Sequence, residues 1–389
     1  MTTSARGRVI GIGIAAVTAL VLSSCASNDA SAPKTSSAAS DTAPASTTAA
    51  TDSSASTAPS SPAGSSTSTG GTVPKGEPDV NGDGKVVIGV LSPGDINDNG
   101  YYESFVSSAE TYAKARHWTV IKRGNVPAND ALNAARALCR LKVDMVALGA
   151  GELANAIPAS EEAVCANTAW YVPSSANIKQ APKIVLSTDD PNQDLLAAGY
   201  AAGLLMKANN QTKAGFVTGI KADFSVLGAK AFKAGIKEIV PNASLITSYT
   251  GDFNDSAKAK EATQAQISQG AKVIYPYLGG ATDASATLAQ QNNVLTLTPG
   301  TDRCSSTSPK FAVSVIFDPG QYFLAALQAF NAGTLAMGVE KVWQMGKDPF
   351  PTVKMCQGTA AQKAQLADFI KKIGDGTIDP KAEVAKLGG

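Results

Sequence analysis

Histidine, the side chain most often used for acid–base chemistry at neutral pH, occurs only once in this 389-residue chain, at position 117. His117 lies between a predicted helix and a predicted strand, where a surface or packing role fits better than a general base. The chain has no Gly-x-Ser-x-Gly or His-Glu-x-x-His motif and no P-loop. A glycosidase-like pair of aspartates is left open, although no pattern favours it. We therefore predict that the protein is not an enzyme and needs no cofactor.

The N-terminus has no apolar run long enough to cross a membrane. Residues 9–22 are apolar and follow Arg6 and Arg8, but they are too few for a stable membrane span, a pattern typical of a signal peptide. They lead into Leu22-Ser23-Ser24-Cys25, which resembles the bacterial lipobox, where cleavage precedes the Cys and its thiol takes a diacylglycerol. We expect residues 1–24 to be a lipoprotein signal peptide and Cys25 to carry the lipid. An ordinary signal peptide with an incidental Cys25 is the alternative.

Large apolar side chains are nearly absent from residues 26–72, which are almost all Ser, Thr, Ala and Pro. Such a segment cannot bury enough surface to offset its ordering entropy, so we expect residues 25–84 to be a lipidated Cys followed by a disordered tether. Residues 79–84 resemble half of a calcium loop, but position twelve is Val90 and not Glu, so we interpret them as a polar turn. The net charge of +1 indicates no nucleic-acid partner.

The chain has no Cys-x-x-Cys motif, which argues against a metal or redox site. Four cysteines remain after Cys25, and an even number in an exported protein favours disulfides, with three possible pairings. We prefer Cys139–Cys165, which links two neighbouring predicted helices, and Cys304–Cys356, which joins the other two. Free buried thiols are the alternative.

The most informative stretch is residues 85–105, in which an apolar β-branched run breaks at Pro93-Gly94 and a helical pattern starts at about Glu103. Strand, loop and helix form the first unit of a βαβ fold, and ligands of open α/β sheets bind at the carboxyl ends of the strands. The loop and the helix start therefore hold the first candidate ligand contacts: Asp95, Asn97, Asp98, Tyr101 and Tyr102. Carboxylates, an amide and aromatic faces suit a small molecule with hydroxyls and a ring better than a phosphate.

Strands and helices then alternate twice along the chain, which predicts two lobes of related architecture, each a doubly wound parallel sheet. The predicted helices are residues 103–116, 130–141, 152–166, 191–206, 226–240, 255–269, 281–291, 318–332 and 360–373. The predicted strands after the first are residues 118–122, 143–147, 169–172, 183–186, 214–218, 243–249, 272–277, 294–297 and 311–316.

We expect lobe 1 to comprise residues 85–188 and about 303–345, and lobe 2 residues 189–302 and about 346–389. Three crossings, near residues 188–190, 298–302 and 338–347, would form the hinge, and the cleft between the lobes is the expected ligand site.

Other candidate contacts follow later strands or begin later helices: Asp189, Phe224, Gly279, Gly280, Asp302 and Phe317. An aspartate in such a loop often caps the next helix instead, as we expect for Asp190 and Asp255. Gly279-Gly280 allows close backbone approach, or is only a turn.

Several motifs together resemble the basic membrane protein family, the PnrA-like substrate-binding lipoproteins of ABC transporters, over about residues 85–330. They are Gly94-Asp95-Ile96-Asn97-Asp98, Phe232-Lys233-Ala234-Gly235, and Gly251-Asp252-Phe253-Asn254-Asp255 with Lys258 and Glu261. The resemblance implies a two-lobed type I periplasmic-binding-protein fold that delivers a ligand to a permease. Several members bind purine nucleosides, with the acidic loop on ribose hydroxyls and aromatic rings on the base.

Carried over by residue, the resemblance gives Asp95, Asn97 and Asp98 the hydroxyl-binding role, and Thr301-Asp302 resembles the acidic turn of the family. Tyr101 stands where the family usually has Phe, Tyr102 where it has Asn, and Phe317 where it commonly has Lys. The expected ligand is thus a small polar ring-bearing molecule, a nucleoside or similar.

We therefore expect a solute-binding lipoprotein of an ABC importer, anchored through Cys25 to the extracytoplasmic face of a bacterial cell membrane. Its expected partners are the ligand and the permease and ATPase of the transporter, and we expect a monomer. A sensory receptor of the same fold is the alternative, followed by a secreted enzyme acting on nucleosides or sugars.

Overall fold

The computed structural model describes residues 78–174 and 178–389. The predicted signal peptide, Cys25 and the tether up to residue 77 lie outside these residues and stay predictions. Among the described residues, no helix combines the length and the apolar character needed to cross a membrane.

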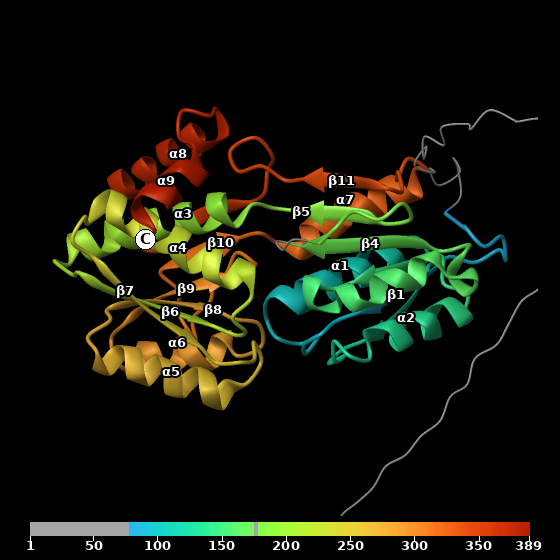
Figure 1. Ribbon diagram of the computed structural model, residues 1–389, viewed down its shortest axis with the longest axis horizontal. Helices are drawn as coiled ribbons and strands as arrows, with labels where there is room; N and C mark the ends of the chain where they lie inside the picture. Colours follow the sequence, from blue (N-terminus) through green and yellow to red (C-terminus); the bar gives the residue numbers. More distant parts are fainter. Residues whose placement is uncertain (1–77, 175–177) are drawn as a thin grey trace, which may run out of the picture. The chain divides into compact units, whose positions relative to one another are not determined.

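The first sheet has six strands in the order β11-β5-β4-β3-β1-β2, and all of its pairings are parallel. Its strands are β1 (Val87–Leu91), β2 (Thr119–Arg123), β3 (Met145–Leu148), β4 (Ala169–Ser174), β5 (Val185–Thr188) and β11 (Val339–Val342). The helical segments packed on it are α1 (Tyr101–Lys114), α2 (Ala131–Arg140), α7 (Pro319–Asn331) and the 3₁₀ segments η1 (Gly151–Glu161) and η2 (Ala163–Cys165) (Figure 1).

The central strands β1 and β3 of this sheet are covered on both faces, to which successive side chains of a strand point in turn. In β3, Met145 and Ala147 pack in the cluster that contains α1 and α7, whereas Val146 and Leu148 pack in the cluster that contains α2 and η1. The sheet is therefore the middle layer of three, as a doubly wound fold requires.

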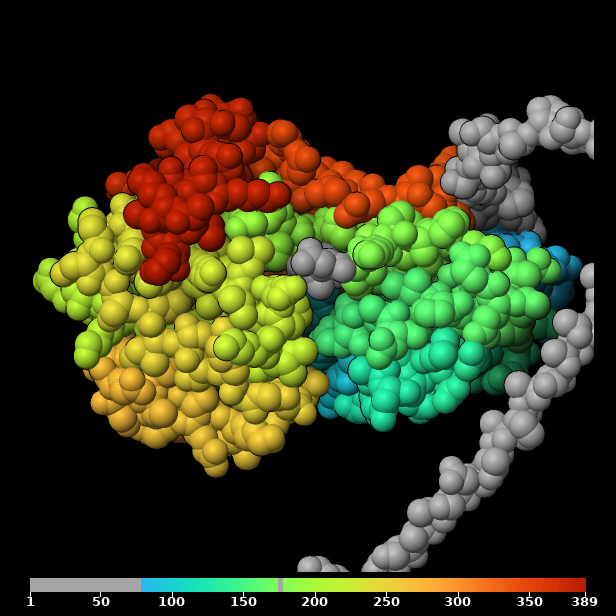
Figure 2. Space-filling model, in the orientation of Figure 1, coloured from blue at the N-terminus to red at the C-terminus, as the bar shows by residue number. Residues whose placement is uncertain are grey.

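The second sheet has the order β12-β10-β9-β8-β6-β7, in which only β12 runs antiparallel to its neighbour. Its strands are β6 (Lys213–Thr218), β7 (Ser244–Tyr249), β8 (Val273–Tyr277), β9 (Leu295–Pro299), β10 (Val313–Ile316) and β12 (Thr352–Met355). One face carries α3 (Pro191–Ala208), α4 (Asp223–Ile239), α8 (Ala360–Gly374) and α9 (Pro380–Leu387), and the other carries α5 (Ser256–Ser268) and α6 (Thr282–Gln291). Figure 2 shows the C-terminal helices, coloured red, lying over the α3–α4 side.

The two predicted α/β series are thus confirmed, and so are two predicted helix caps. Asp190 accepts the amide of Asn192 at 2.9 Å, and Asp255 accepts the amides of Ala257 and Lys258, both at 3.0 Å. Residues 152–166 were predicted as one helix but form two 3₁₀ segments, since Pro158 has no N–H to donate inside η1. The pattern did not reveal β11, β12 or α9.

The second predicted crossing, at residues 298–302, is wrong. β9 and β10 pair side by side in the second sheet, so the chain leaves that sheet only at Phe317-Asp318, before α7 packs on the first sheet. Residues 303–316 consequently do not belong to lobe 1 as expected. The other two crossings are found where the chain passes from β5 to α3 and from β11 to β12.

The preferred cysteine pairing is also present: Cys139 is bonded to Cys165, and Cys304 to Cys356. At the N-terminal edge, residues 78–84 belong to the predicted tether but are ordered. Asp79 accepts the amides of Gly82 and Gly84, both at 2.7 Å, which confirms the predicted polar turn.

Candidate functional site

A cavity of about 370 Å³ opens between loops of the two sheets, close to the carboxyl ends of their strands. Its volume lies in the range of small-molecule sites, which start at about 300 Å³. The lining residues from the first-sheet side are Tyr101, Tyr102, Ala150, Gly151 and Glu152. Those from the second-sheet side are Ile220, Ala222, Asp223, Phe224, Phe253, Tyr277, Leu278, Gly279, Pro299 and Phe317.

Six aromatic rings form a continuous wall around this cavity, which we call the aromatic wall. In order of contact, they are Tyr102, Tyr101, Phe317, Tyr277, Phe224 and Phe253. Centroids of neighbouring rings are 5.5–6.3 Å apart, from the 5.5 Å of Tyr101–Tyr102 to the 6.3 Å of Phe224–Tyr277. These separations are those of favourable edge or offset aromatic contacts, so the wall is held in place by its own members.

Glu152 is the acidic side chain that lines the cavity from the first-sheet side. It is the second residue of η1, and its Oε1 accepts a hydrogen bond from the hydroxyl of Tyr102 at 3.2 Å. Burial raises the pKa of Glu152, although its own amide and the Tyr102 hydroxyl act in the opposite direction. The carboxyl therefore sits in an environment that disfavours its negative charge.

Two further aspartates do not line the cavity but act electrostatically on its tyrosines. Asp194 is buried in the first turn of α3, and its pKa is raised well above its usual value by burial and then by the charges of Asp189 and Asp190. Asp189 accepts a hydrogen bond from the Tyr322 hydroxyl at 3.4 Å. Burial and then the charges of Asp189, Asp194 and Glu152 raise the pKa of Tyr277, so this phenol stays neutral.

The structure brings only part of the predicted site to the cavity: Tyr101, Tyr102, Phe224, Gly279 and Phe317. Gly279 has a clear steric role, because a Cβ there would lie 2.7 Å from the Tyr102 ring and 2.9 Å from Asn254 Oδ1. Gly280 lies beside it and donates its amide to the same Asn254 oxygen at 2.8 Å. Glycine thus lets loops from the two sheets approach each other.

The acidic loop does not line the cavity. Asp98 accepts the amides of Gly100 and Glu103, each at 3.0 Å, and that of Tyr102 at 3.3 Å, so it caps the first turn of α1. Asp95 accepts the backbone and side-chain amides of Asn97 in an exposed turn. Ligand contact by these three residues stays a prediction.

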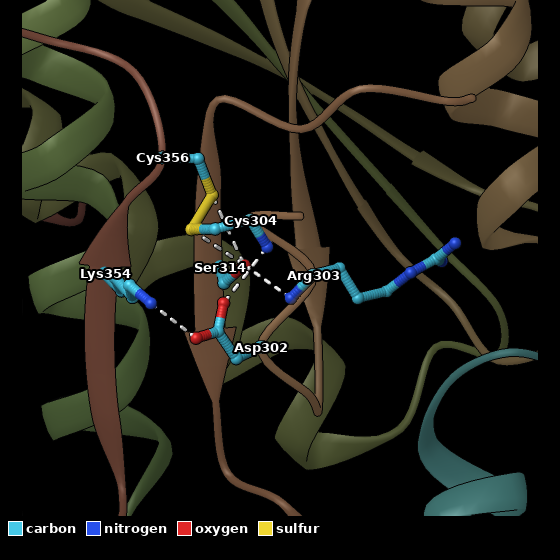
Figure 3. The surroundings of a disulfide bond; sticks show 6 residues. All are labelled: Asp302, Arg303, Cys304, Ser314, Lys354 and Cys356. Atoms are coloured by element: carbon cyan, nitrogen blue, oxygen red, sulfur yellow. Dashed lines mark hydrogen bonds and ion pairs between the residues drawn. A yellow bond between two sulfur atoms is a disulfide. The ribbon is translucent and has the colours of Figure 1, made fainter. Parts of the chain in front are cut away.

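Asp302 lies beside the second disulfide and does not line the cavity (Figure 3). Its carboxylate accepts the Lys354 ammonium at 2.7 Å and the Cys304 amide at 3.0 Å. Burial by itself would raise the pKa of Asp302, but these donors outweigh it and lower the pKa. Asp302 is therefore the anionic partner of an ion pair that stabilises the loop between β9 and β10.

Sequence reasoning missed Glu152, Phe253 and Tyr277. Glu152 follows the turn Gly149-Ala150-Gly151 at the end of β3, and Tyr277 ends β8. Their place at the carboxyl end of a buried parallel strand was the available signal for both, as it was for the first loop.

A model of the PnrA-like ABC transporter substrate-binding proteins matches residues 85–349, well over half of the chain. The chain belongs to this family. The match extends beyond the motifs that carried the sequence resemblance and includes all fifteen residues that line the cavity.

The chain is also similar to the ABC transporter nucleoside-binding protein BmpA of Lactococcus lactis, with 31% identity over 103 residues, 26% of this chain and 28% of BmpA. It therefore spans less than a third of the length of that curated relative. Among solved structures, a solute-binding protein from Conexibacter woesei is similar with a TM-score of 0.59 and 20% identity, covering 76% of this chain and 98% of that one. A second, from Aeropyrum pernix, has a TM-score of 0.61 and 14% identity, covering 78% and 90%. These two likenesses show the periplasmic-binding fold.

Proposed function

We propose that this protein is the extracytoplasmic solute-binding component of an ABC importer, and that it binds a small ring-bearing ligand in the cavity between its two sheets. The observation that carries this proposal is the aromatic wall, whose rings come from both sheets and contact one another around a cavity of ligand size. A planar ring fits between such faces, since stacking on aromatic side chains is favourable for many ring systems. The name of the relative BmpA supports nucleosides as a first ligand class to test.

The anchor and the partners belong to the same proposal. Lipidation at Cys25 would hold the receptor at the membrane, where it hands the ligand to a permease with its ATPase. Binding without chemical conversion is the proposed task, and the two sheets with the three segments that join them would form two lobes that move about a hinge.

The test is a thermal-shift screen of the protein against nucleosides, nucleobases, sugars and vitamins. A ligand at 100 times its dissociation constant is expected to stabilise the protein by about 2.7 kcal/mol. The matched variants are Phe224→Ala, which opens the aromatic wall, and Tyr249→Ala, which removes an exposed ring of β7 outside the cavity. Phe224→Ala is expected to weaken binding about tenfold, and Tyr249→Ala to leave it unchanged. If no compound stabilises the protein, or if Phe224→Ala binds as well as the wild type, the proposed site is wrong.

A further inference from the structure

The lining of the cavity has an asymmetry of charge. Among the described residues that line it, Glu152 and Asp223 are acidic and none is Lys, Arg or His. Lys221 is adjacent in sequence to two lining residues, but its Nζ lies 5.9 Å from the Tyr249 ring on the surface of β7. The cavity is therefore lined by aromatic faces, small and aliphatic groups and two carboxyl groups, without a cationic side chain among these residues.

The electrostatic surroundings of the aromatic wall have the same sign. Burial raises the pKa of Tyr101, and the carboxyl groups of Asp189 and Glu152 raise it further. Burial likewise raises the pKa of Tyr277, and Asp189, Asp194 and Glu152 add to the effect. Each of these carboxyl groups disfavours further negative charge in a region of low dielectric. An anionic ligand would meet this field without a compensating cation.

A positive charge on the ligand would be stabilised both by the aromatic faces and by the carboxyl groups of the cavity. The face of an aromatic ring carries negative electrostatic potential, and a cation within about 6 Å of the ring centroid is attracted to it, most strongly when water is excluded. The Glu152 carboxyl lies at the edge of the same wall, through its hydrogen bond with Tyr102. Burial makes its negative charge costly, and a bound cation would offset that cost.

We propose that this cavity selects ring-bearing ligands that carry a positive charge, with the cationic group between the carboxylate of Glu152 and the faces of Tyr101 and Tyr102. This inference rests on the proposed function and narrows it from small polar rings to cationic ones. Tyr102 has two contributions: its ring lines the cavity, and its hydroxyl orients Glu152 Oε1. The rings of the second sheet, Phe224, Tyr277 and Phe317, then enclose the apolar part of the ligand.

The experiment compares ligands of nearly equal shape and different charge by isothermal titration calorimetry at pH 7.5. One pair is 4-hydroxyphenyltrimethylammonium and 4-tert-butylphenol, and the other is 1-methyladenosine, which is cationic, and its neutral isomer N6-methyladenosine. In at least one pair, the cationic member is expected to bind about tenfold tighter or better than the neutral member. This ratio, measured on the wild-type protein, decides the inference by itself.

Two variants locate the effect. Glu152→Gln keeps the acceptor for the Tyr102 hydroxyl but removes the charge, and it is expected to bring the affinity ratio of the pair close to one. Glu161→Gln is the matched control, because Glu161 lies on the same η1 segment, is exposed and does not line the cavity. It is expected to keep the wild-type ratio. A ratio that survives in Glu152→Gln would overturn the assignment of Glu152.

The outcomes separate the two proposals. If the neutral member of each pair binds as tightly as the cationic one, or if only neutral or anionic compounds from the wider screen bind, the charge preference is wrong and the solute-binding proposal stands. If no compound of the screen and no member of either pair binds, both fail.

Discussion

Replacing Asp98 with alanine tests whether this residue holds the ligand or holds the helix that presents the ligand-binding rings. Its carboxylate accepts the backbone amides of Gly100, which precedes α1, and of Tyr102 and Glu103 in the first turn of α1. Two residues of that turn, Tyr101 and Tyr102, belong to the aromatic wall. Loss of a helix cap costs about 0.5–2 kcal/mol, and here three amides lose one acceptor together. We expect Asp98→Ala to lower the free energy of unfolding by about 2 kcal/mol, at the upper end of that range.

Asp98→Asn distinguishes the two roles, because its side-chain oxygen still accepts amide hydrogen bonds but carries no charge. If Asp98 acts only as a cap, the Asn variant should retain most of the stability and bind ligand like the wild type. Asp95→Ala is the matched control, since Asp95 is exposed and bonds only within its own turn. It is expected to change the free energy of unfolding by less than about 0.5 kcal/mol.

Urea denaturation followed by circular dichroism gives the free energy of unfolding, and calorimetric titration with a ligand from the screen gives the affinity. An Asp98→Ala variant that unfolds with the stability of the wild type would show that Asp98 does not cap α1. Strong loss of binding in a fully stable Asp98→Asn variant would instead establish direct ligand contact, as the sequence suggested.

Two further predictions concern a buried acid and a close approach of loops. The folded-state pKa of Asp194 is raised, so its contribution to stability is full below the unfolded-state pKa of about 4 and is lost as pH rises through the folded pKa. Asp194→Asn should therefore be more stable than the wild type at pH 7, with a difference that shrinks towards pH 4 in urea titrations; a difference independent of pH would contradict this. Gly279→Ala places a Cβ against the ring of Tyr102, with about 1–3 kcal/mol of strain. The two loops belong to different sheets and can separate. This strain should therefore weaken ligand binding much more than it lowers the free energy of unfolding measured in urea. Equal losses of binding and of unfolding free energy would contradict this prediction.

The elements of each sheet could be predicted because their signals are local. Alternating apolar strands and helices, and aspartates such as Asp190 that precede a helix, depend on neighbours within a few residues. The pairing of Cys304 with Cys356 was accessible because only three pairings existed.

Local sequence signals do not determine which sheet a strand joins or which residues line the cavity. A buried strand has the same apolar pattern beside any neighbour, so the pattern of β10 could not tell which sheet it joins, and the crossing was placed too early. The contact of Tyr102 with Glu152 joins residues 50 positions apart in the chain. Only the pairing of β1 with β3, whose carboxyl ends lead into α1 and η1, brings the phenol and the carboxyl together.

The corrected crossing connects the aromatic wall to the joint between the sheets. Phe317 follows β10 directly, and the next residue, Asp318, caps α7 and accepts the hydroxyl of Ser104 in α1. Tyr101 begins the same helix α1, and its ring lies 6.1 Å from that of Phe317. We expect a change in the angle between the two sheets to alter the spacing of these two rings, and a ligand held between them to favour one angle over others. This reciprocity is what a receptor needs if a permease is to distinguish its loaded form from its empty one.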